Sequence, residues 1–350
     1  MKIAYILPSL ANMGPIMVAN VIIENLIDKV DTIDVYYFDD KIGLDFKCKT
    51  IQIESIRKPI NFDSYDIIHS HGYRPDKYVS KFKKSIRKAK IVSTIHSDIR
   101  KDLSYTYNPI ISYLFTRLWH RNLRQMDAVV VISKKLLSIY SSTFENISII
   151  HNGIRVCYSP ENNDAIQKIR DLKNKGLKII GTYAAITKRK GIDMLISLLD
   201  RRKDIGLVII GEGKEKKHLQ NWVNRKGYSD RVLFFPYLHK PYNYIDDFDV
   251  YAMPSRSEGF GLAMVEAAMC KIPVVCSDIE VFREIFDETQ AVFFELENIK
   301  SLSNAIDYAI ENRNILTENA CDKVTGYFTG VAMANNYLNF YNTIIGNGKI

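Results

Sequence analysis

The 350-residue sequence lacks several features that define other classes of protein. No apolar run approaches the ~20 residues that a membrane-spanning helix needs. The run Ile3–Leu7 near the amino terminus stops at Pro8 and is too short for a secretory signal, so we interpret it as the first strand of a folded domain. No G-x-G-x-x-G turn follows a predicted strand, which disfavours a nicotinamide-dependent dehydrogenase. We therefore expect a cytoplasmic α/β protein of another kind.

Cysteine is scarce, and its placement excludes a disulfide framework. The cysteines are odd in number, and no two have the C-x-x-C spacing of a zinc or redox site. We expect the cysteines to act as small, buried, apolar side chains of a protein in a reducing compartment. The five residues are Cys48, Cys157, Cys270, Cys276 and Cys321.

Acidic side chains are rare in one part of an otherwise ordinary composition. Lysine and arginine number 48 against 40 acidic residues, but residues 71–135 alone hold 15 basic and 4 acidic side chains. Such a segment suits an anionic partner, for example a phospholipid surface. The alternative is a solvated basic face, with Lys81–Lys90 on one helix. No nucleic-acid-binding signature accompanies the charge, so we expect no nucleic-acid partner.

One stretch of this basic segment is also rich in aromatic residues. Residues 105–124 alternate tyrosine, phenylalanine and tryptophan with Arg117, Arg121 and Arg124. A helix with this pattern can lie in a membrane interface. A helix of the domain core with basic solvent contacts is the alternative, and we favour peripheral contact with an anionic membrane.

Short apolar runs alternate with longer amphipathic runs along the whole chain. Strands buried on both faces that alternate with helices predict doubly wound parallel sheets, and two such series predict two domains. The predicted strands are Lys2–Leu7, Asp34–Phe38, Ile67–His69, Ile91–Ile95, Ala128–Ile132, Ile147–Ile150, Ile179–Tyr183, Gly206–Ile210, Arg231–Phe235, Val250–Met253 and Pro273–Cys276.

The predicted domain boundary follows a change in composition. Turn-forming and charged residues interrupt the pattern over Cys157–Gly176. We expect an N-terminal domain over 1–158 and a C-terminal domain over 159–330, with the helix at 331–350 packing back on the first domain. Ligands of doubly wound sheets bind beyond the carboxyl ends of the strands, so the loops there are where site residues belong.

The stretch 255–267 is the most informative in the chain. A predicted strand ends at Pro254, and a glycine-bearing loop leads into a predicted helix over Gly261–Cys270. Backbone N–H groups of 259–262 are expected to point at an anion, with the helix dipole behind them. Glu258 and Glu266 cannot bind phosphate themselves, and carboxylates in such a place accept hydrogen bonds from hydroxyls. The expected ligand therefore has phosphate groups between two hydroxyl-bearing rings, as a sugar nucleotide does.

The sequence Glu258-Gly-Phe-Gly-Leu-Ala-Met-Val-Glu266-Ala resembles the E-x7-E signature of retaining glycosyltransferases of family 4, which have the GT-B fold. Other segments resemble the same family, namely Ile209-Ile-Gly-Glu-Gly-Lys, Lys188-Arg-Lys-Gly-Ile, Asp66-Ile-Ile-His-Ser-His-Gly and Ser93-Thr-Ile-His-Ser. The resemblance implies two facing Rossmann-like domains with a cleft between them, and no cofactor and no metal ion.

The resemblance also implies roles for individual residues. Glu258, Lys190 and His96 are implied as catalytic, beside the donor sugar and its leaving diphosphate. The donor-binding residues that it implies are Gly14, Arg189, Gly259, Phe260, Gly261, Leu262 and Glu266, with Glu266 on the nucleotide ribose. An acidic pattern at Asp247 and Asp249 directly precedes a predicted strand, and we interpret it as a turn and not as a metal site.

The chain departs from the family pattern at one important place. Aligned on Lys190, the Gly-Arg-Leu of relatives corresponds to Ala184, Ala185 and Ile186, so the arginine on the diphosphate is missing and Arg189 or Lys188 is the candidate replacement. The resemblance implies retaining transfer of a hexosyl or N-acetylhexosaminyl group, most simply from a UDP-sugar. The basic first domain favours a lipid-linked glycan acceptor at the inner membrane, as in synthesis of a bacterial O-antigen or capsule. The alternatives are a catalytically silent nucleotide-sugar-binding protein and a sugar-nucleotide epimerase of the same fold.

Overall fold

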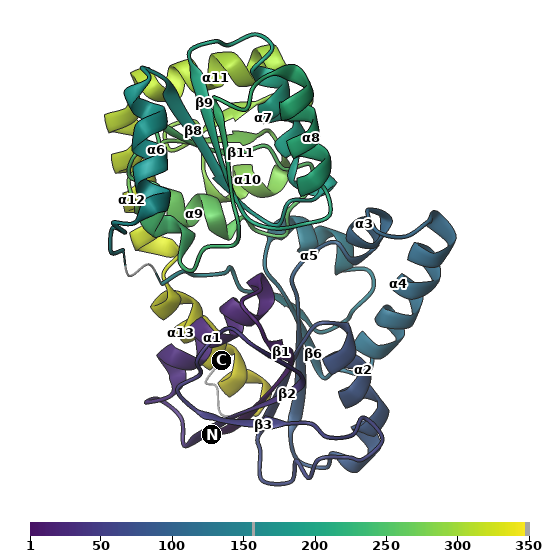
Figure 1. Ribbon diagram of the computed structural model, residues 1–350. Helices are drawn as coiled ribbons and strands as arrows, with labels where there is room; N and C mark the ends of the chain where they lie inside the picture. The colour runs from purple at the N-terminus through teal and green to yellow at the C-terminus, as the bar shows by residue number, and fades with distance from the viewer. Residues whose placement is uncertain (156–157, 347–350) are drawn as a thin grey trace. The chain divides into compact units, whose positions relative to one another are not determined.

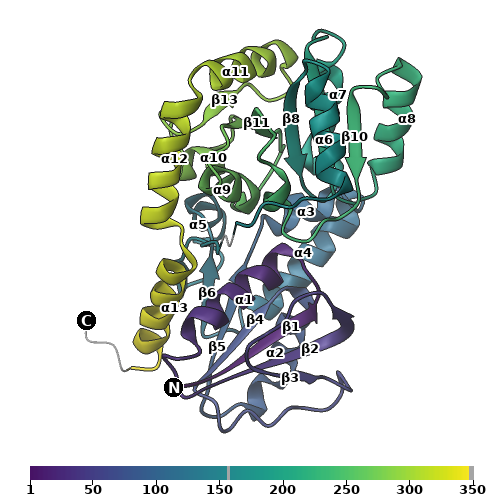
Figure 2. The same ribbon diagram turned by 60° about the vertical axis from the view of Figure 1, so that its left-hand side comes forward.

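The chain packs as two units. The computed structural model describes residues 1–155 and 158–346. Unit 1 contains residues 1–155 and 328–346, and unit 2 contains the described residues between them (Figures 1 and 2). Each unit has its own parallel sheet, which confirms the expectation of two doubly wound sheets.

Unit 1 is built on seven strands in the order β3-β2-β1-β4-β5-β6-β7, and every pair is parallel. Its central strands are buried along most of their length because helices cover both faces of the sheet. Its elements are β1 (Lys2–Leu10), α1 (Gly14–Leu26), β2 (Thr32–Ile42), β3 (Lys49–Gln52), β4 (Ile67–His71), α2 (Tyr73–Phe82), η1 (Lys83–Ser85), β5 (Lys90–Ile95), α3 (Ile99–Ser104), α4 (Pro109–Leu123), β6 (Ala128–Val131), α5 (Lys134–Tyr140), β7 (Ile147–Ile149) and α13 (Gly330–Ile344).

Unit 2 has six parallel strands in the order β10-β9-β8-β11-β12-β13. Its elements are α6 (Asp164–Asn174), β8 (Lys178–Tyr183), η2 (Lys188–Lys190), α7 (Ile192–Leu198), β9 (Ile205–Ile210), α8 (Lys216–Lys226), β10 (Val232–Phe235), η3 (Pro241–Tyr244), β11 (Val250–Met253), α9 (Leu262–Met269), β12 (Val274–Ser277), α10 (Glu280–Ile285), β13 (Val292–Phe294), α11 (Ile299–Glu311) and α12 (Arg313–Tyr327).

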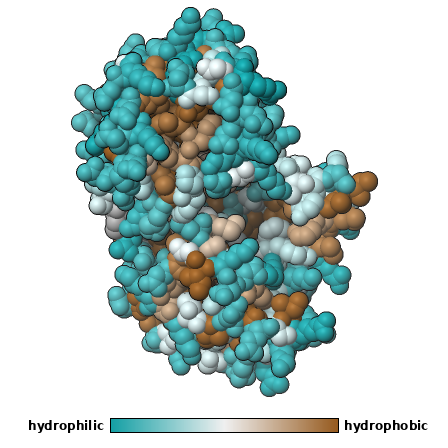
Figure 3. All heavy atoms as spheres, in the orientation of Figure 1, coloured by the Kyte–Doolittle hydropathy of each residue, from teal (hydrophilic) through white to brown (hydrophobic). Residues whose placement is uncertain are grey.

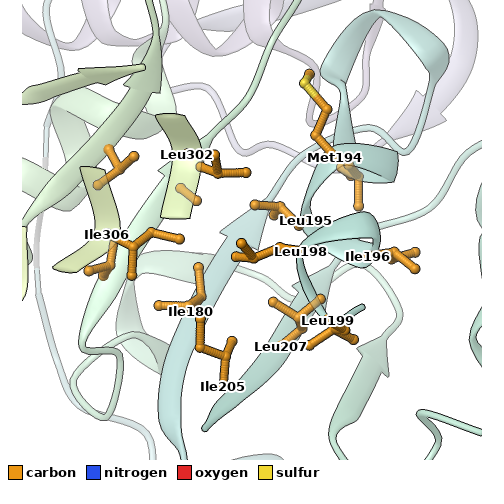
Figure 4. Close-up of a cluster of buried hydrophobic side chains, with 14 of the residues drawn as sticks. Ile180, Met194, Leu195, Ile196, Leu198, Leu199, Ile205, Leu207, Leu302 and Ile306 are labelled. Atoms are coloured by element: carbon orange, nitrogen blue, oxygen red, sulfur yellow. The ribbon is translucent and has the colours of Figure 1, made fainter. Parts of the chain in front are cut away.

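The core of unit 2 lies between the sheet and helices α7 and α11. Leu195 and Leu198 of α7 meet Leu302 of α11 over the strand residues Ile180 and Leu207, and all five are buried (Figure 4). Burying each such side chain contributes roughly 1.5–3 kcal/mol. This packing fixes α7, and with it the loop that joins β8 to α7.

The structure corrects several details of the sequence analysis. The eleven predicted strands are present, with ends shifted by a few residues, but the short edge strands β3 and β13 were not predicted. Residues 164–174, which we placed in the break between domains, form helix α6 of unit 2. The basic residues Lys81–Lys90 do not share one helix, because α2 ends at Phe82, η1 follows, and Lys90 begins β5.

Two further corrections concern cysteines and the aromatic stretch. Of the four cysteines that the structure describes, only Cys276 is buried, and Cys157 lies outside the described residues. The stretch 105–124 is not one helix, because α3 ends at Ser104 and α4 begins only at Pro109.

Within residues 1–155 and 158–346, no helix is both long enough and apolar enough to cross a bilayer.

Candidate active site

The predicted donor residues of unit 2 lie where the strand order of its sheet reverses. Strand β8 pairs with β9 on one side and with β11 on the other, so the connections after β8 and β11 leave in opposite directions. Such a point leaves a crevice beyond the carboxyl ends of the two strands. Lys190 lies on the loop after β8, and Glu258 lies on the loop after β11.

Glu258 is held by two cations and a hydroxyl. Its Oε1 accepts hydrogen bonds from Lys190 Nζ at 2.5 Å and Ser255 Oγ at 2.8 Å, and its Oε2 accepts one from Arg189 Nη1 at 3.1 Å. The Glu258 side chain is only 7% exposed. Burial opposes ionisation, but the charges of Lys190 and Arg189 outweigh it and hold the pKa of Glu258 below its usual value. The carboxylate is therefore charged at neutral pH, and the three side chains carry a net charge of +1.

Gly191 allows the two loops to meet. Its φ is +65°, and a β-carbon there would lie 1.9 Å from the carbonyl oxygen of Pro254. The backbone N–H of Arg256 then donates to the carbonyl of Arg189 at 2.8 Å. The Arg256 guanidinium also bridges Asp193 and Glu297. The Lys-Gly pair thus places Lys190 against the Glu258 loop.

Gly261 turns the Glu258 loop into helix α9. It is the N-cap of α9 with φ +113°, a conformation that side chains rarely adopt, and a β-carbon would meet the ring of Phe282 at 2.9 Å. The backbone N–H groups of Leu262 and Ala263 stand in the first turn, where a helix offers them no acceptor. Of the predicted residues 259–262, Gly261 and Leu262 thus form the amino end of α9, whereas Gly259 and the buried Phe260 lie in the loop before it. This end of the helix suits an anion.

Glu266 has the opposite electrostatic environment. It lies within α9, is 7% exposed, and is next to Tyr183 at the end of β8. Burial raises the pKa of Glu266 to about 7, and Tyr183 offsets part of that rise. Among the residues that the structure describes, no cation compensates this carboxyl group as Lys190 compensates Glu258. Hydroxyl groups that donate hydrogen bonds would stabilise its charged form.

The structure distinguishes the two candidate replacements for the missing arginine. Ala185 is exposed and Ile186 is fully buried, so neither supplies a cation. Lys188 is exposed, whereas Arg189 donates to Glu258 and, at 2.9 Å, to the carbonyl of Ser257. Of the two candidate replacements, Arg189 is the one within the Glu258 cluster.

The remaining predicted residues belong to unit 1. Its strand order reverses between β1 and β4, and Gly14, His71 and His96 all lie at or just after carboxyl ends of neighbouring strands. His96 Nε2 and His71 Nδ1 share a hydrogen bond of 2.8 Å, and their rings stack at 5.1 Å between centroids. Burial lowers the pKa of His96 to about 3, so His96 is neutral at pH 7. Gly14 opens α1 and is exposed, and a β-carbon added there would have open space for 4 Å around it, so packing does not require glycine at this position.

His69 links this histidine pair to helix α13, since its ring lies 4.3 Å from that of His71 between centroids. His69 shares hydrogen bonds with Tyr341 of α13 at 2.6 Å and with Thr94 of β5 at 2.8 Å. The hydroxyl of Tyr341 also lies 2.9 Å from that of Tyr5 on β1. His71 Nε2 is buried and has no hydrogen-bond partner among the described residues. Buried polar atoms are usually paired, so this nitrogen is a candidate contact for a ligand group.

The acidic pattern at residues 247–249 is engaged by cations of unit 2. Arg170 pairs with Asp247, and Lys173 lies 3.4 Å from Asp249. Asp249 also accepts a hydrogen bond from the backbone N–H of Ile179 at 2.7 Å, which joins the turn to β8. Among the described residues, no three side chains of His, Cys, Asp and Glu gather as a metal site.

Sequence reasoning missed two residues of these sites, Ser255, which donates to Glu258, and Tyr183, which borders Glu266. His71 lies in a segment that the sequence analysis singled out, but its hydrogen bond with His96 was not predicted. Ser255 had a signal, because it lies three residues before Glu258 in the same loop. Tyr183 ends β8, the neighbour of β11, and His71 ends β4, the neighbour of β5. These contacts depend on the order of the strands in the sheet, which the sequence does not reveal.

Comparison with known families and proteins agrees with these observations. Residues 163–323 match the model for glycosyl transferases group 1, and residues 36–156 match the model for glycosyltransferase family 4. The O-antigen biosynthesis glycosyltransferase WclY of Escherichia coli is 34% identical, over 98% of this chain and 99% of its own length. The lipopolysaccharide core biosynthesis mannosyltransferase LpsB of Rhizobium meliloti is 26% identical over 55% of this chain and 57% of its own.

Solved structures show the same fold. Anabaena HepE, in a complex with UDP and glucose, superposes with a TM-score of 0.82 and 19% identity over 98% of this chain and 100% of its own. Sucrose-phosphate synthase from Thermosynechococcus elongatus gives a TM-score of 0.80 with 18% identity and 99% coverage of both chains. At this level of identity the likeness establishes the fold, which is the expected GT-B fold.

Proposed function

The chain belongs to the group 1 glycosyltransferases of family 4, and from that premise we propose that it moves a sugar from a UDP-sugar to a hydroxyl of a glycan acceptor with retention at the anomeric carbon. Unit 2 binds the donor, and unit 1 supplies the acceptor side. The transferred group is a hexosyl or N-acetylhexosaminyl residue.

The observation that carries this proposal is that two carboxyl groups, Glu258 in the loop before α9 and Glu266 within α9, have different electrostatic environments. Glu258 is charged and held by Lys190 and Arg189, while Glu266 is buried and no cation of the described chain offsets its burial. The amino end of α9 lies between them in sequence and suits a diphosphate. This arrangement matches a donor whose diphosphate joins two hydroxyl-bearing rings: sugar hydroxyls bind Glu258, and ribose hydroxyls bind Glu266.

Lys190 and Arg189 act by stabilising charge. As the bond between the sugar and the diphosphate breaks, negative charge grows on the leaving phosphate. Lys190 has three donor hydrogens and gives one to Glu258, so it retains donors for the phosphate. Cations and helix amides that are already in place stabilise such charge without reorganisation. The acceptor hydroxyl attacks from the face that the diphosphate leaves, and its proton passes to the leaving phosphate oxygen.

The acceptor and setting follow from the relatives and from the charge of the chain. WclY is named for O-antigen biosynthesis and matches over nearly its full length, which supports a role in assembling a bacterial surface polysaccharide. The basic segment at residues 71–135 supports a lipid-diphosphate-linked acceptor at the cytoplasmic face of the inner membrane. Activity without a bound metal ion is part of the proposal, because Lys190, Arg189 and the α9 amides supply positive charge.

A donor screen tests the proposal. The purified protein is incubated with a panel of UDP- and GDP-sugars, with and without a chelator, first alone and then with lipid-linked glycan acceptors. We expect slow nucleotide release from one donor, faster release with acceptor, and no effect of the chelator. Proton NMR of the product is expected to show the anomeric configuration of the donor.

Each competing function has its own result. A catalytically silent binding protein is the alternative suggested by Ala185, which stands where relatives have an arginine on the diphosphate. Such a protein binds a nucleotide sugar tightly and never releases nucleotide. An epimerase converts the donor sugar in the absence of acceptor. Either result, or an inverted product, contradicts the proposed reaction.

A further inference from the structure

Helix α4 exposes a row of apolar side chains. Seven of the sixteen large hydrophobic side chains that are exposed in the described chain fall within residues 105–118. Ile110, Leu114 and Leu118 follow each other at intervals of four and form one stripe, 72%, 54% and 51% exposed. Ile111 widens the stripe, and it is 46% exposed. Figure 3 shows brown side chains gathered at the right-hand edge, over the α3–α4 region labelled in Figure 1.

The inner face of the same helix is anchored by polar groups. Ser112 and Thr116 are buried, and the Trp119 indole N–H donates to Asp76 Oδ2 at 2.7 Å. Asp76 also accepts hydrogen bonds from Ser70 of β4 and Ser93 of β5, and its burial raises its pKa to about 6. The helix thus buries two hydroxyl side chains together with Leu123, and its outer apolar stripe is left for a partner.

Positive charge accompanies the apolar stripe. Helix α4 contains no acidic residue, and Arg117 and Arg121 lie one turn apart next to the stripe. Arg117 stacks on Tyr113, whose hydroxyl it also contacts at 3.2 Å. A cavity of about 490 Å³ lies along this side of α4, and Arg100, Lys101 and Arg117 contribute to its lining, together with one acidic residue, Asp98.

We propose that α3 and α4 form the surface by which this protein binds an anionic phospholipid bilayer. Ile110, Ile111, Leu114 and Leu118 enter the interface between headgroups and acyl chains, as the apolar face of an interfacial helix does. The cavity of Arg100, Lys101 and Arg117 receives the phosphate of one lipid headgroup. The inference rests on the proposed function only in that a lipid-linked acceptor requires the protein to reach a membrane.

Vesicle flotation tests this surface on the full-length protein. The vesicles contain phosphatidylcholine alone or phosphatidylcholine with phosphatidylglycerol. One variant carries Leu114→Ser and Leu118→Ser, and a second carries Arg117→Gln and Arg121→Gln. The matched controls change exposed residues of unit 2, Ile315→Ser for the first and Arg201→Gln with Arg225→Gln for the second.

We expect the wild-type protein and both controls to bind anionic vesicles, with weaker binding as salt increases. The arginine variant is expected to bind roughly 30-fold more weakly, from about fivefold for each cation near the surface. The leucine variant is expected to lose at least as much. Donor-dependent nucleotide release without vesicles stays unchanged in both variants, so a failure here is separate from a failure of the proposed reaction.

Three results overturn the inference. The first is that the wild-type protein does not bind anionic vesicles, and the second is that the two variants bind as well as their controls. The third is that the wild-type protein is a dimer by analytical ultracentrifugation and becomes monomeric in the leucine variant, because the stripe then binds a second copy of the chain.

Discussion

At the scale of single residues, the two motif carboxyl groups differ in what compensates their burial. Glu258 has Lys190, Arg189 and Ser255 as partners, and its pKa is lowered. Glu266 is also buried, but among the described residues Tyr183 is the one side chain that offsets the burial, and its pKa is raised to about 7. A group that titrates near neutral pH in a binding site makes ligand binding depend on pH.

The donor is therefore expected to bind more tightly as pH rises through 7. Ribose hydroxyls donate hydrogen bonds to the charged form of Glu266, which is scarce below its pKa of about 7 and predominant above it. Between pH 6 and pH 8 the affinity should rise about tenfold and then level off. Titration calorimetry with a nucleotide sugar measures this, because its diphosphate does not titrate in that range.

The control for this prediction is Glu266→Gln. The variant cannot ionise at position 266, so its affinity should be weaker and flat across the same pH range. An equally steep pH dependence in the variant would assign the titration to another group.

The sequence predicts the candidate site residues, but it did not predict their partners. The motif spacing points to Glu258 and Glu266, and the Lys-Gly pair points to Lys190. The hydrogen bond from Lys190 to Glu258 joins residues 68 positions apart in the chain. Local sequence carries no information on that contact, which depends on β8 and β11 being neighbours in the sheet.

At the scale of elements, the turn η2 depends on a close backbone approach. Gly191 has a positive φ, and its missing side chain leaves room for the carbonyl of Pro254. Gly227, at the end of α8, has a similar φ of +72° but open space around it. Comparing substitutions at these two glycines therefore separates the cost of a side chain at positive φ from the cost of its steric clash with the Pro254 carbonyl.

Gly191→Ala should therefore be more damaging than Gly227→Ala. The change at 227 should cost about 1 kcal/mol of unfolding free energy, from backbone strain alone. The change at 191 should cost at least about 2 kcal/mol more and reduce nucleotide release, because it pushes the Lys190 turn away from the Glu258 loop. Urea unfolding and the release assay measure both effects, and equal losses for the two variants would refute the proposed role of the close approach.

Sequence periodicity predicted the interior strands and missed the edges. Strands such as β9 are apolar and wholly buried, which gives a clear pattern. Strand β3 has four residues, three of them exposed, and β13 has only three residues. Short edge strands form because a neighbour offers hydrogen bonds, not because their own sequence demands it. Helix α4 shows the same limit, since its composition does not tell which face is buried.

At the scale of the whole molecule, the basic segment and the Glu258 cluster belong to different units. Helix α13 follows unit 2 in sequence but packs with unit 1, where Tyr341 bonds to His69 and Tyr5. The basic segment 71–135 belongs to unit 1, and the Glu258 cluster belongs to unit 2. Donor chemistry and membrane binding are thus expected to be lost by different substitutions.

The proposed reaction requires Glu258 to belong to the catalytic centre of a glycosyltransferase. Nucleotide release from the donor identified by the screen tests this, comparing Glu258→Gln with Glu318→Gln, an exposed glutamate of the same unit. We predict a loss of about 100-fold or more for Glu258→Gln and an unchanged rate for Glu318→Gln, with both variants folded by circular dichroism. Nucleotide release at the wild-type rate by a folded Glu258→Gln protein would contradict the proposed role of this carboxylate.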